Sequence, residues 1–209
     1  QDLIPFVNTF AVFMTTRGSD PIQSLIAYDK LNVKIAGNYA GLSDSYDGAS
    51  HQAITDIAVV RSMPNMTVVS VSDAVETAKA VEAIAEYDGP VYLRLSRAPA
   101  PVIFDENYDF RIGKGVELKT GKDVAIIATG TILHNALKAA DLLKEEGIEA
   151  TVINIHTIKP IDEELIIDAA KRTGAVLTVE EHSIHGGLGS AVAEVLSKAC
   201  PTPIEFVGA

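Results

Sequence analysis

Short apolar runs alternate along this chain with longer stretches of helical periodicity, and this alternation constrains the fold more than any other feature. The runs are rich in β-branched residues and cover 32–37, 66–71, 91–95, 123–129, 150–155, 175–179 and 204–207. Most of them are apolar nearly throughout, a pattern typical of strands that are buried on both faces of a parallel sheet. The chain is therefore predicted to be an α/β protein built from βαβ units with right-handed crossovers.

Four stretches between the runs have the spacing and end signals of helices, and they cover 74–87, 131–146, 161–171 and 189–200. The first follows Asp73 and has Glu76 in its first turn, which is the spacing of a capping box. Pro160 is expected in the first turn of the third helix, where a missing N–H is tolerated. A further helix is expected to begin near His51.

The regular alternation breaks between residues 98 and 121, where prolines and glycines are frequent and no helical period is present. We therefore expect two domains, 1–100 and 122–209, joined by a linker over 101–121 that carries a small strand at 115–119. Each half has about 100 residues, which is a usual domain size. The expected architecture is two three-layer αβα domains with mainly parallel sheets.

The charge balance disfavours whole classes of partner. The 209 residues include 17 lysines and arginines against 28 aspartates and glutamates, so the formal net charge is −11. Such an acidic surface repels phosphate backbones and anionic lipid headgroups, and the sequence contains no run of basic residues that would offset this repulsion. We therefore expect neither nucleic-acid binding nor membrane binding.

The chain carries one cysteine, Cys200, which excludes an intrachain disulfide framework and a cysteine-rich zinc site. A reducing cytoplasm is the simplest setting for such a chain. No stretch of 18 consecutive apolar residues predicts a transmembrane helix. The N-terminus has neither an initiator Met nor a basic segment followed by an apolar run, so it is interpreted as the interior of a longer protein rather than a signal peptide.

Sites in open parallel sheets form beyond the carboxyl ends of the strands, so the segments that follow strands are the candidates. Phe10 and Phe13 are three residues apart and would share a face of a helix. They either begin a core-facing helix or form an aromatic wall for a flat ring. Near the end of the run 91–95, Arg97 is better placed than Arg94 to meet an anion, because a guanidinium fork suits phosphate. The alternative for either arginine is an ion pair with a nearby acid.

A long loop rich in glycine and serine, 39–52, follows the run 32–37. Asp47 could simply form a turn and His51 could be a polar residue of a first helical turn. Alternatively, His51 exchanges protons near neutral pH beside an Asp47 that binds hydroxyl groups. Both interpretations are open on the residues alone. The segment 180–189 is rich in Glu, His and Gly but lacks dinucleotide, Walker or hydrolase motifs, so a structural role against a neighbouring domain is favoured.

These segments resemble the transketolase family, and specifically the C-terminal section of split transketolases. The matching blocks are Pro-Phe-Val-Asn-Thr-Phe-Ala-Val-Phe-Met at 5–14, Asp-Gly-Ala-Ser-His-Gln at 47–52, Pro-Asn-Met-Thr-Val at 64–68, Asp-Ala-Val-Glu-Thr at 73–77, Gly-Pro-Val-Tyr at 89–92 and the run 179–189. The similarity is collinear over essentially the whole chain. It implies a pyrimidine-binding domain that is incomplete at its N-terminus and a transketolase C-terminal domain that is incomplete at its C-terminus.

The resemblance implies a two-carbon ketol transfer between sugar phosphates with thiamine diphosphate as cofactor. Phe10 and Phe13 match the aromatic residues around the aminopyrimidine of the cofactor, and Asp47 and His51 match residues that contact sugar hydroxyls near the reacting carbon. Arg97 matches the arginine that binds the substrate phosphate. The diphosphate and its divalent metal, Mg or Ca, would be bound by a partner, the N-terminal transketolase section, in a homodimer or heterotetramer.

Some positions depart from the family pattern. Tyr39 stands where a phosphate-contacting His is usual, 43–46 replaces a Thr-Val-Gly-Glu type sequence, Thr16 replaces an aromatic residue and Gln23 an Arg. The family's essential glutamate belongs to a segment that would precede Pro5. A non-catalytic structural or regulatory subunit is therefore an alternative to the enzyme component. A related thiamine-dependent β-subunit, of the 2-oxoacid dehydrogenase or deoxyxylulose-phosphate synthase type, is another, although the block at 47–52 favours transketolase.

Overall fold

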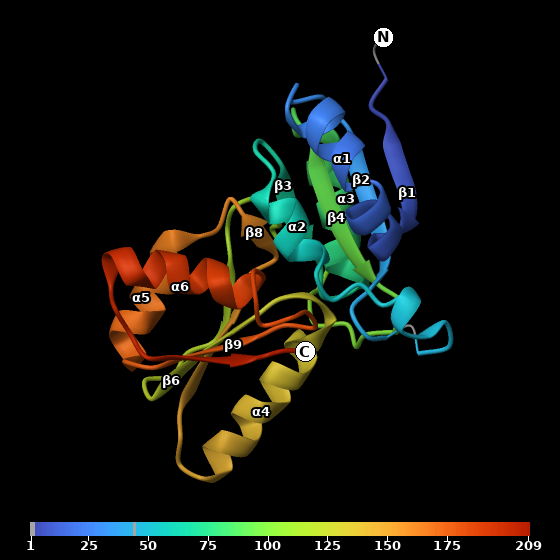
Figure 1. The fold of residues 1–209 in the computed structure, drawn as a ribbon. Helices are drawn as coiled ribbons and strands as arrows, with labels where there is room; N and C mark the ends of the chain where they lie inside the picture. Colours follow the sequence, from blue (N-terminus) through green and yellow to red (C-terminus); the bar gives the residue numbers. More distant parts are fainter. Residues whose placement is uncertain (1–2, 44) are drawn as a thin grey trace.

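The computed structural model describes residues 3–43 and 45–209, and it contains two mixed five-stranded sheets within these residues (Figure 1). The first sheet has the strand order β1-β2-β4-β3-β8, and the second has the order β10-β9-β6-β7-β5. The strands of the first sheet are β1 (Phe6–Phe10), β2 (Lys34–Ala40), β3 (Thr67–Ser70), β4 (Val91–Ser96) and β8 (Thr157–Lys159). Those of the second are β5 (Val116–Lys119), β6 (Val124–Ala128), β7 (Ala150–Asn154), β9 (Val176–Val179) and β10 (Ile204–Val207).

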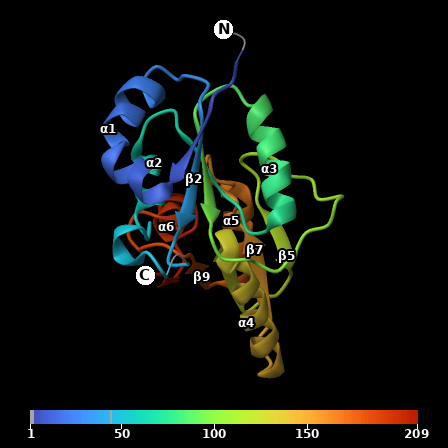
Figure 2. The same ribbon diagram turned by 90° about the vertical axis from the view of Figure 1, so that its right-hand side faces the viewer.

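Helices cover the first sheet on two faces. Figure 2 shows α3 (Ala74–Glu86) on one side of the sheet and, on the other, α2 (Asp56–Ser62) together with a helical segment near the N-terminus. That segment is composed of η1 (Phe13–Arg17), α1 (Ser19–Pro21) and η2 (Ile22–Ala27). Pairs β1–β2, β2–β4 and β4–β3 are parallel, so their carboxyl ends meet at one edge. In Figure 1 the arrows of β1 and β4 point toward the second half of the molecule.

The second sheet is parallel except for β5, which runs antiparallel to β7. Successive residues of β6 point to opposite faces, so Ile126 packs with α4 (Leu133–Glu145) while Ala125 and Ile127 pack with α5 (Glu163–Thr173) and α6 (Leu188–Ala199). Strands buried on both faces explain why the apolar runs of the sequence do not alternate. The prediction of an α/β protein with two mainly parallel sheets is confirmed.

Three elements were not among those predicted. β1 is too short to show a clear alternation of apolar and polar residues. The helical segment of 13–27 has no clear end signals, and β8 consists of three residues only. Although β8 belongs by sequence to the second half, it pairs antiparallel with β3 of the first sheet. The small strand expected at 115–119 is present as β5, inside the stretch predicted as a linker.

Three local predictions are corrected. Phe10 is the last residue of a strand, so it does not share a helix face with Phe13. The helix expected near His51 begins at Asp56, after a short 3-10 turn at Gly48–Ser50. Pro160 precedes the third predicted helix instead of lying in its first turn, because the Asp162 side chain caps the helix by accepting from the Leu165 N–H at 3.3 Å.

Asp73 and Glu76 bind the segment 101–121, which joins the two halves and is called the connector below. The Asp73 carboxylate accepts the Glu76 N–H at 2.8 Å, as the capping-box spacing predicted, and also the N–H groups of Ile103 and Phe104 at 2.6 and 2.9 Å. The buried Glu76 carboxylate accepts the Ser72 N–H, and side-chain donors of Tyr108 and Asn154 reach it from the connector and from β7. Burial raises the pKa of Glu76, although these hydrogen bonds oppose the shift.

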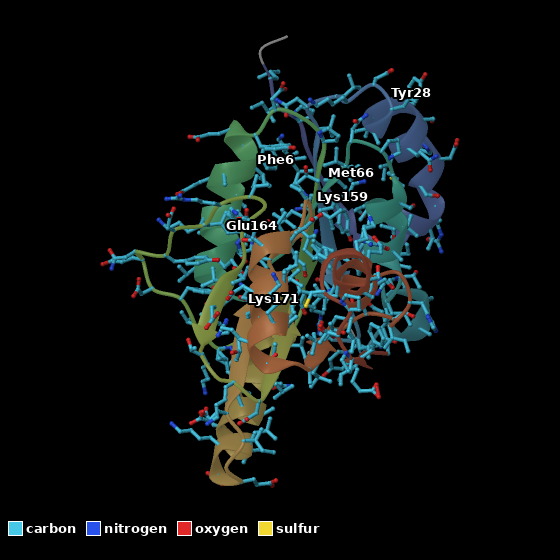
Figure 3. All side chains as sticks on the ribbon, turned by 90° about the vertical axis from the view of Figure 1, so that its left-hand side faces the viewer. Phe6, Tyr28, Met66, Lys159, Glu164 and Lys171 are labelled. Atoms are coloured by element: carbon cyan, nitrogen blue, oxygen red, sulfur yellow. The ribbon has the colours of Figure 1, made fainter. Side chains whose placement is uncertain are left out.

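The segment that follows β9 packs against the first half, as predicted. Glu180 accepts the N–H groups of Leu188 and Gly189 at 2.7 and 2.8 Å and so caps α6. The N–H of Ser183 donates to the Ile54 carbonyl at 2.7 Å. At the same junction, Lys159 of β8, which is labelled in Figure 3, donates to the carbonyl oxygens of Arg61 and Met63.

Candidate functional site

Phe10 and Phe13 form a partly exposed pair of rings at the carboxyl edge of the first sheet. Phe10 ends β1, and Phe13 begins the helical segment that follows it. Their ring centroids lie 5.3 Å apart with a tilt of 47°. Neither ring is enclosed in the hydrophobic core, because both side chains retain intermediate exposure. The rings therefore offer an accessible apolar surface, which is what an aromatic wall for a flat ligand requires.

His51 stands edge-on against both rings. Its ring centroid is 5.3 Å from that of Phe10 and 5.1 Å from that of Phe13, with interplanar angles of 73° and 67°. The imidazole Nδ1 lies 2.9 Å from the Ser50 hydroxyl oxygen, within hydrogen-bonding distance. This hydrogen bond leaves Nε2 as the nitrogen that can act on a ligand. The structure thus brings together Phe10, Phe13 and His51, which the sequence singled out, and their three rings are called the ring cluster below.

Asp47 lies at the start of the 3-10 turn that leads to His51. Its side chain is exposed, and the described residues show no side-chain hydrogen bond or ion pair between Asp47 and His51. The turn is closed by the His51 N–H, which donates to the Gly48 carbonyl at 3.0 Å. Asp47 is therefore held near the ring cluster by the turn and its carboxylate faces solvent.

Tyr39 joins this cluster through an unusual backbone conformation. Its φ of 58° lies in the left-handed region, which is strained for a large aromatic residue, and it occurs where the register of β2 against β4 shifts between Gly37 and Ala40. The Tyr39 ring centroid lies 4.4 Å from that of Phe10. The sequence drew attention to Tyr39 only as a departure from a family pattern, and no periodicity signals a left-handed residue within a strand.

Arg97 reaches the cluster through Tyr39. The guanidinium carbon lies 5.7 Å from the centroid of the Tyr39 ring and 5.5 Å from that of Tyr46. The Arg97 N–H donates to the Ser43 hydroxyl at 3.2 Å, and this hydroxyl lies 2.9 Å from that of Ser96. The loop after β2 and the end of β4 are thereby tied together, and the arginine side chain remains exposed.

Two further residues of the cluster were missed from the sequence. Arg17 places its guanidinium carbon 4.5 Å above the Phe13 ring, and the spacing of four residues from Phe13 is a signal that could have revealed it. Tyr46 is 88% exposed and contacts Arg97, and it lies in a loop without periodicity. The contacts form a row that runs from Arg17 through Phe13, Phe10 and Tyr39 to Arg97.

Arg94 has a different role from Arg97. It is buried, and its Nε donates to Asp56 at 2.7 Å while one Nη donates to the carbonyl of Glu181 at 2.9 Å. Burial opposes the charge of Arg94, but Asp56 more than compensates and raises the pKa of the guanidinium. Tyr92 also donates to Asp56 at 2.8 Å. Arg94 therefore forms the ion pair that was the alternative on the sequence.

The residues that the structure describes contain neither a candidate metal site nor a helix that could span a membrane. Within 3–43 and 45–209, no group of three or more His, Cys, Asp or Glu side chains is arranged to hold a metal ion. Over the same residues, no helix combines the length and apolar character that crossing a membrane demands.

Comparison with known families matches both halves of the chain. The family model described as the transketolase pyrimidine binding domain matches residues 1–101, and the one described as the transketolase C-terminal domain matches residues 113–209. The chain belongs to the transketolase family. The resemblance stated from the sequence motifs is thus confirmed, and the stretch between the two matched ranges contains the connector that Asp73 holds.

Transketolase relatives align with almost the whole chain. A 6-deoxy-6-sulfo-D-fructose transketolase subunit from Clostridium sp. (strain MSTE9) is 43% identical and covers 98% of this chain, which in turn covers 64% of the relative. An apulose-4-phosphate transketolase component from Phocaeicola vulgatus is 40% identical over 97% of this chain and 65% of its own length. The chain therefore spans slightly less than two thirds of these curated relatives.

A solved transketolase structure has the same fold. It is described as a split gene transketolase, inactive beta4 tetramer, and it superposes with a TM-score of 0.93 at 51% identity. The match covers 98% of this chain and 67% of the solved chain. The strand orders and helix placements given above are therefore those of a transketolase subunit.

Proposed function

We propose that this chain is the pyrimidine-binding and C-terminal part of a thiamine diphosphate-dependent transketolase. The assembly transfers a two-carbon ketol unit between sugar phosphates and is active only when a partner domain or subunit holds the diphosphate. The observation that carries this proposal is the wall of Phe10, Phe13 and His51, because it lies exposed at the carboxyl edge of a parallel sheet in a pyrimidine-binding domain.

The ring wall fits the cofactor by its shape and polarity. A pyrimidine ring is flat and aromatic, and the half-exposed faces of Phe10 and Phe13 supply the apolar contact area that such a ring prefers. When bound, thiamine diphosphate supplies the nucleophilic carbon to which the two-carbon unit is transferred. The residues of this chain hold the pyrimidine and exclude water from one side of it.

His51 and Asp47 are proposed to act on the sugar. With Nδ1 of His51 hydrogen-bonded to Ser50, its Nε2 can donate a proton to, or take one from, a sugar hydroxyl beside the reacting carbon. The exposed carboxylate of Asp47 accepts hydrogen bonds from the other hydroxyl groups. Arg97, at the end of the aromatic row, binds the terminal phosphate of the substrate.

The partner is proposed to be an N-terminal transketolase section that carries the diphosphate and a divalent metal, Mg or Ca, in a homodimer or heterotetramer. Support comes from the edge strand β1, which has Phe6 47% exposed and Val7 45% exposed on opposite faces. An edge strand with uncovered apolar side chains is a surface suited to contact with another polypeptide. The cytoplasm is the proposed location, because the metabolites of such an enzyme are intracellular and the single Cys200 needs no oxidising compartment.

A non-catalytic structural or regulatory subunit is the alternative, and the strained Tyr39 and the altered loop 43–46 are the observations that favour it. The test is reconstitution of the complete assembly with its diphosphate-binding partner, thiamine diphosphate and Mg²⁺. We expect ketol transfer from a ketose phosphate to an aldose phosphate by the assembly. An assembly that transfers nothing would support the structural or regulatory subunit, and an assembly that binds no cofactor would refute the thiamine diphosphate-dependent function.

A further inference from the structure

The loop that carries Asp47 and His51 is closed at its base within the first half. The Gly41 N–H donates to the Ala53 carbonyl at 2.8 Å, and Ala53 also forms isolated β-bridges with Ala40 and Gly41. Ala53 is buried, so this base is part of the packed interior. Because His51 precedes Ala53 by only two residues, a shift of the base would also shift the imidazole.

The second half of the chain binds this base from both sides. On one side, the Leu42 N–H donates to Oε1 of Glu181 at 2.6 Å. On the other side, the Ile54 carbonyl accepts the Ser183 N–H at 2.7 Å. Leu42 and Ile54 are the residues next to the hydrogen bond that closes the loop, so the short segment 181–183 holds both strands of the loop where they enter and leave it.

The glycine at position 41 allows the Glu181 side chain to approach the loop backbone. The φ of Gly41 is +81°, in the left-handed region that favours glycine. A Cβ at this position would lie 2.5 Å from Cδ of Glu181, which is too close for any real side chain. The carboxylate therefore lies directly against the main chain at the start of the loop.

The second half and the buried Arg94 also hold Glu181 itself in place. The hydroxyl of Thr131, in the 3-10 turn η4 (Gly130–Ile132), donates to Oε2 of Glu181 at 3.3 Å. One Nη of Arg94 donates to the Glu181 carbonyl at 2.9 Å and to the Ala53 carbonyl at 3.3 Å. The side chain and the main chain of Glu181 are thus both fixed, as is required of a group that positions another.

We propose that Glu181 is a positioning residue through which the second half holds the loop, so that the His51 imidazole keeps its place against the rings of Phe10 and Phe13. Glu181 acts through the Leu42 N–H and the base of the loop. This inference rests on the proposed function, in which His51 exchanges a proton with a sugar hydroxyl. It gives the second half a part in the reaction in addition to its packing against the first half.

The experiment uses the complete assembly and compares Glu181→Ala and Glu181→Gln with the unaltered protein. Glu181→Ala should lower kcat by about 10–100-fold, because a displacement of about 1 Å in a reacting group is costly at this level. The affinity for thiamine diphosphate should change far less, because Phe10 and Phe13 lie outside the loop. Glu181→Gln keeps an oxygen that accepts the Leu42 N–H, so it should retain most of kcat. Glu145→Ala, which changes an exposed glutamate at the end of α4, is the control and should leave both quantities unchanged.

Two further measurements separate positioning from a general loss of stability. In a His51→Ala background, Glu181→Ala should cause little additional loss of kcat, because both changes affect the same group. Amide hydrogen exchange at Leu42 should be about tenfold faster in Glu181→Ala, because a hydrogen bond to a charged acceptor is lost. If Glu181→Ala does not assemble, Glu181→Asp replaces it, since a carboxylate that is one methylene shorter withdraws from the Leu42 N–H and should lower kcat in the same direction.

An unchanged kcat in Glu181→Ala or Glu181→Asp overturns the inference and leaves the proposed function intact. A loss that adds in full to the loss in His51→Ala overturns it as well, because Glu181 would then act independently of the histidine. Absence of ketol transfer by the unaltered, cofactor-loaded assembly would instead refute the proposed function, and the positioning role would fall with it.

Discussion

The Arg94 guanidinium and the Asp56 carboxylate form an ion pair in which both side chains are almost completely buried, with Nε and Oδ2 separated by 2.7 Å. Asp56 begins α2, Arg94 lies in β4, and the same guanidinium reaches the carbonyl of Glu181 in the second half. The pair thus joins a helix, a strand and the neighbouring domain. A buried charge that keeps all its partners is tolerated, whereas one that loses its counter-ion is costly.

Asp56→Ala is expected to lower the free energy of unfolding by about 3–5 kcal/mol, because it leaves Arg94 buried and unpaired and removes the acceptor of Tyr92. Chemical denaturation of the purified chain measures this loss. The double variant Asp56→Ala, Arg94→Met should recover part of the stability, since the uncompensated charge is gone. A single variant as stable as the unaltered protein would contradict this account.

The buried His156 is expected to make the folded protein less stable as the pH falls below 7. Burial lowers the pKa of this histidine to about 4, and its ring packs 4.1 Å from that of Phe110. In the unfolded chain the pKa is about 6.5, so between these values the unfolded state binds a proton that the folded state does not, and stability falls as the pH falls. Glu76, with its raised pKa, contributes the opposite slope.

We expect the His156 contribution to cost about 2 kcal/mol between pH 7 and pH 5. Urea denaturation at the two pH values should show this loss in the unaltered protein and in His185→Gln, a change of an exposed histidine. The loss should be smaller in His156→Gln. Equal pH dependence in all three proteins would show that His156 is not the group responsible.

Phe10→Ala removes the ring that contacts Phe13, Tyr39 and His51, so it should weaken thiamine diphosphate binding by the assembly about tenfold. Isothermal titration of the assembled protein measures the change. Phe206→Ala is the matched control, because Phe206 is a partly exposed phenylalanine of β10 in the second half. Equal weakening in both variants would indicate a general loss of stability rather than a lost cofactor contact.

His51→Ala should lower kcat for ketol transfer by about 10²–10⁴-fold while cofactor affinity changes far less, because general acid–base catalysis contributes at that level. The measurements are steady-state kinetics and cofactor titration on the same preparation. Equal losses in both would contradict the proton-transfer role and would indicate that His51 serves only to complete the ring wall.

Arg97→Ala should raise KM by about 10–100-fold for sugars with an anionic terminal group and leave kcat nearly unchanged, because a charged hydrogen-bond donor to the substrate is lost. The comparison uses the same sugars without that group, whose KM should not move. Arg111→Ala, which changes an exposed arginine of the connector, is the control. A KM that stays constant would remove Arg97 from the site.

Most strands and helices of this fold can be predicted from the sequence, but the candidate site can be predicted only in part. Apolar runs such as 150–155 predicted their strands closely, because burial on both faces leaves a simple pattern. β8 was missed because three residues carry no period, and its pairing with β3 is a long-range event. The rings of Phe10, Phe13 and His51, which the sequence singled out, are in contact, whereas Arg97 reaches them only through Tyr39. The Tyr39 contact depends on a left-handed backbone that only tertiary packing can impose.

The strand that crosses from one half to the other makes the two halves thermodynamically dependent on each other. If the polypeptide were divided in the connector, the first piece would lose β8, and main-chain groups of Val68 and Val69 would become an open sheet edge. Ile158, which is buried in the core of the first half, would leave a void there. Calorimetry of the intact chain should accordingly record one cooperative melting event, and separately expressed halves should associate or aggregate in place of behaving as independent modules.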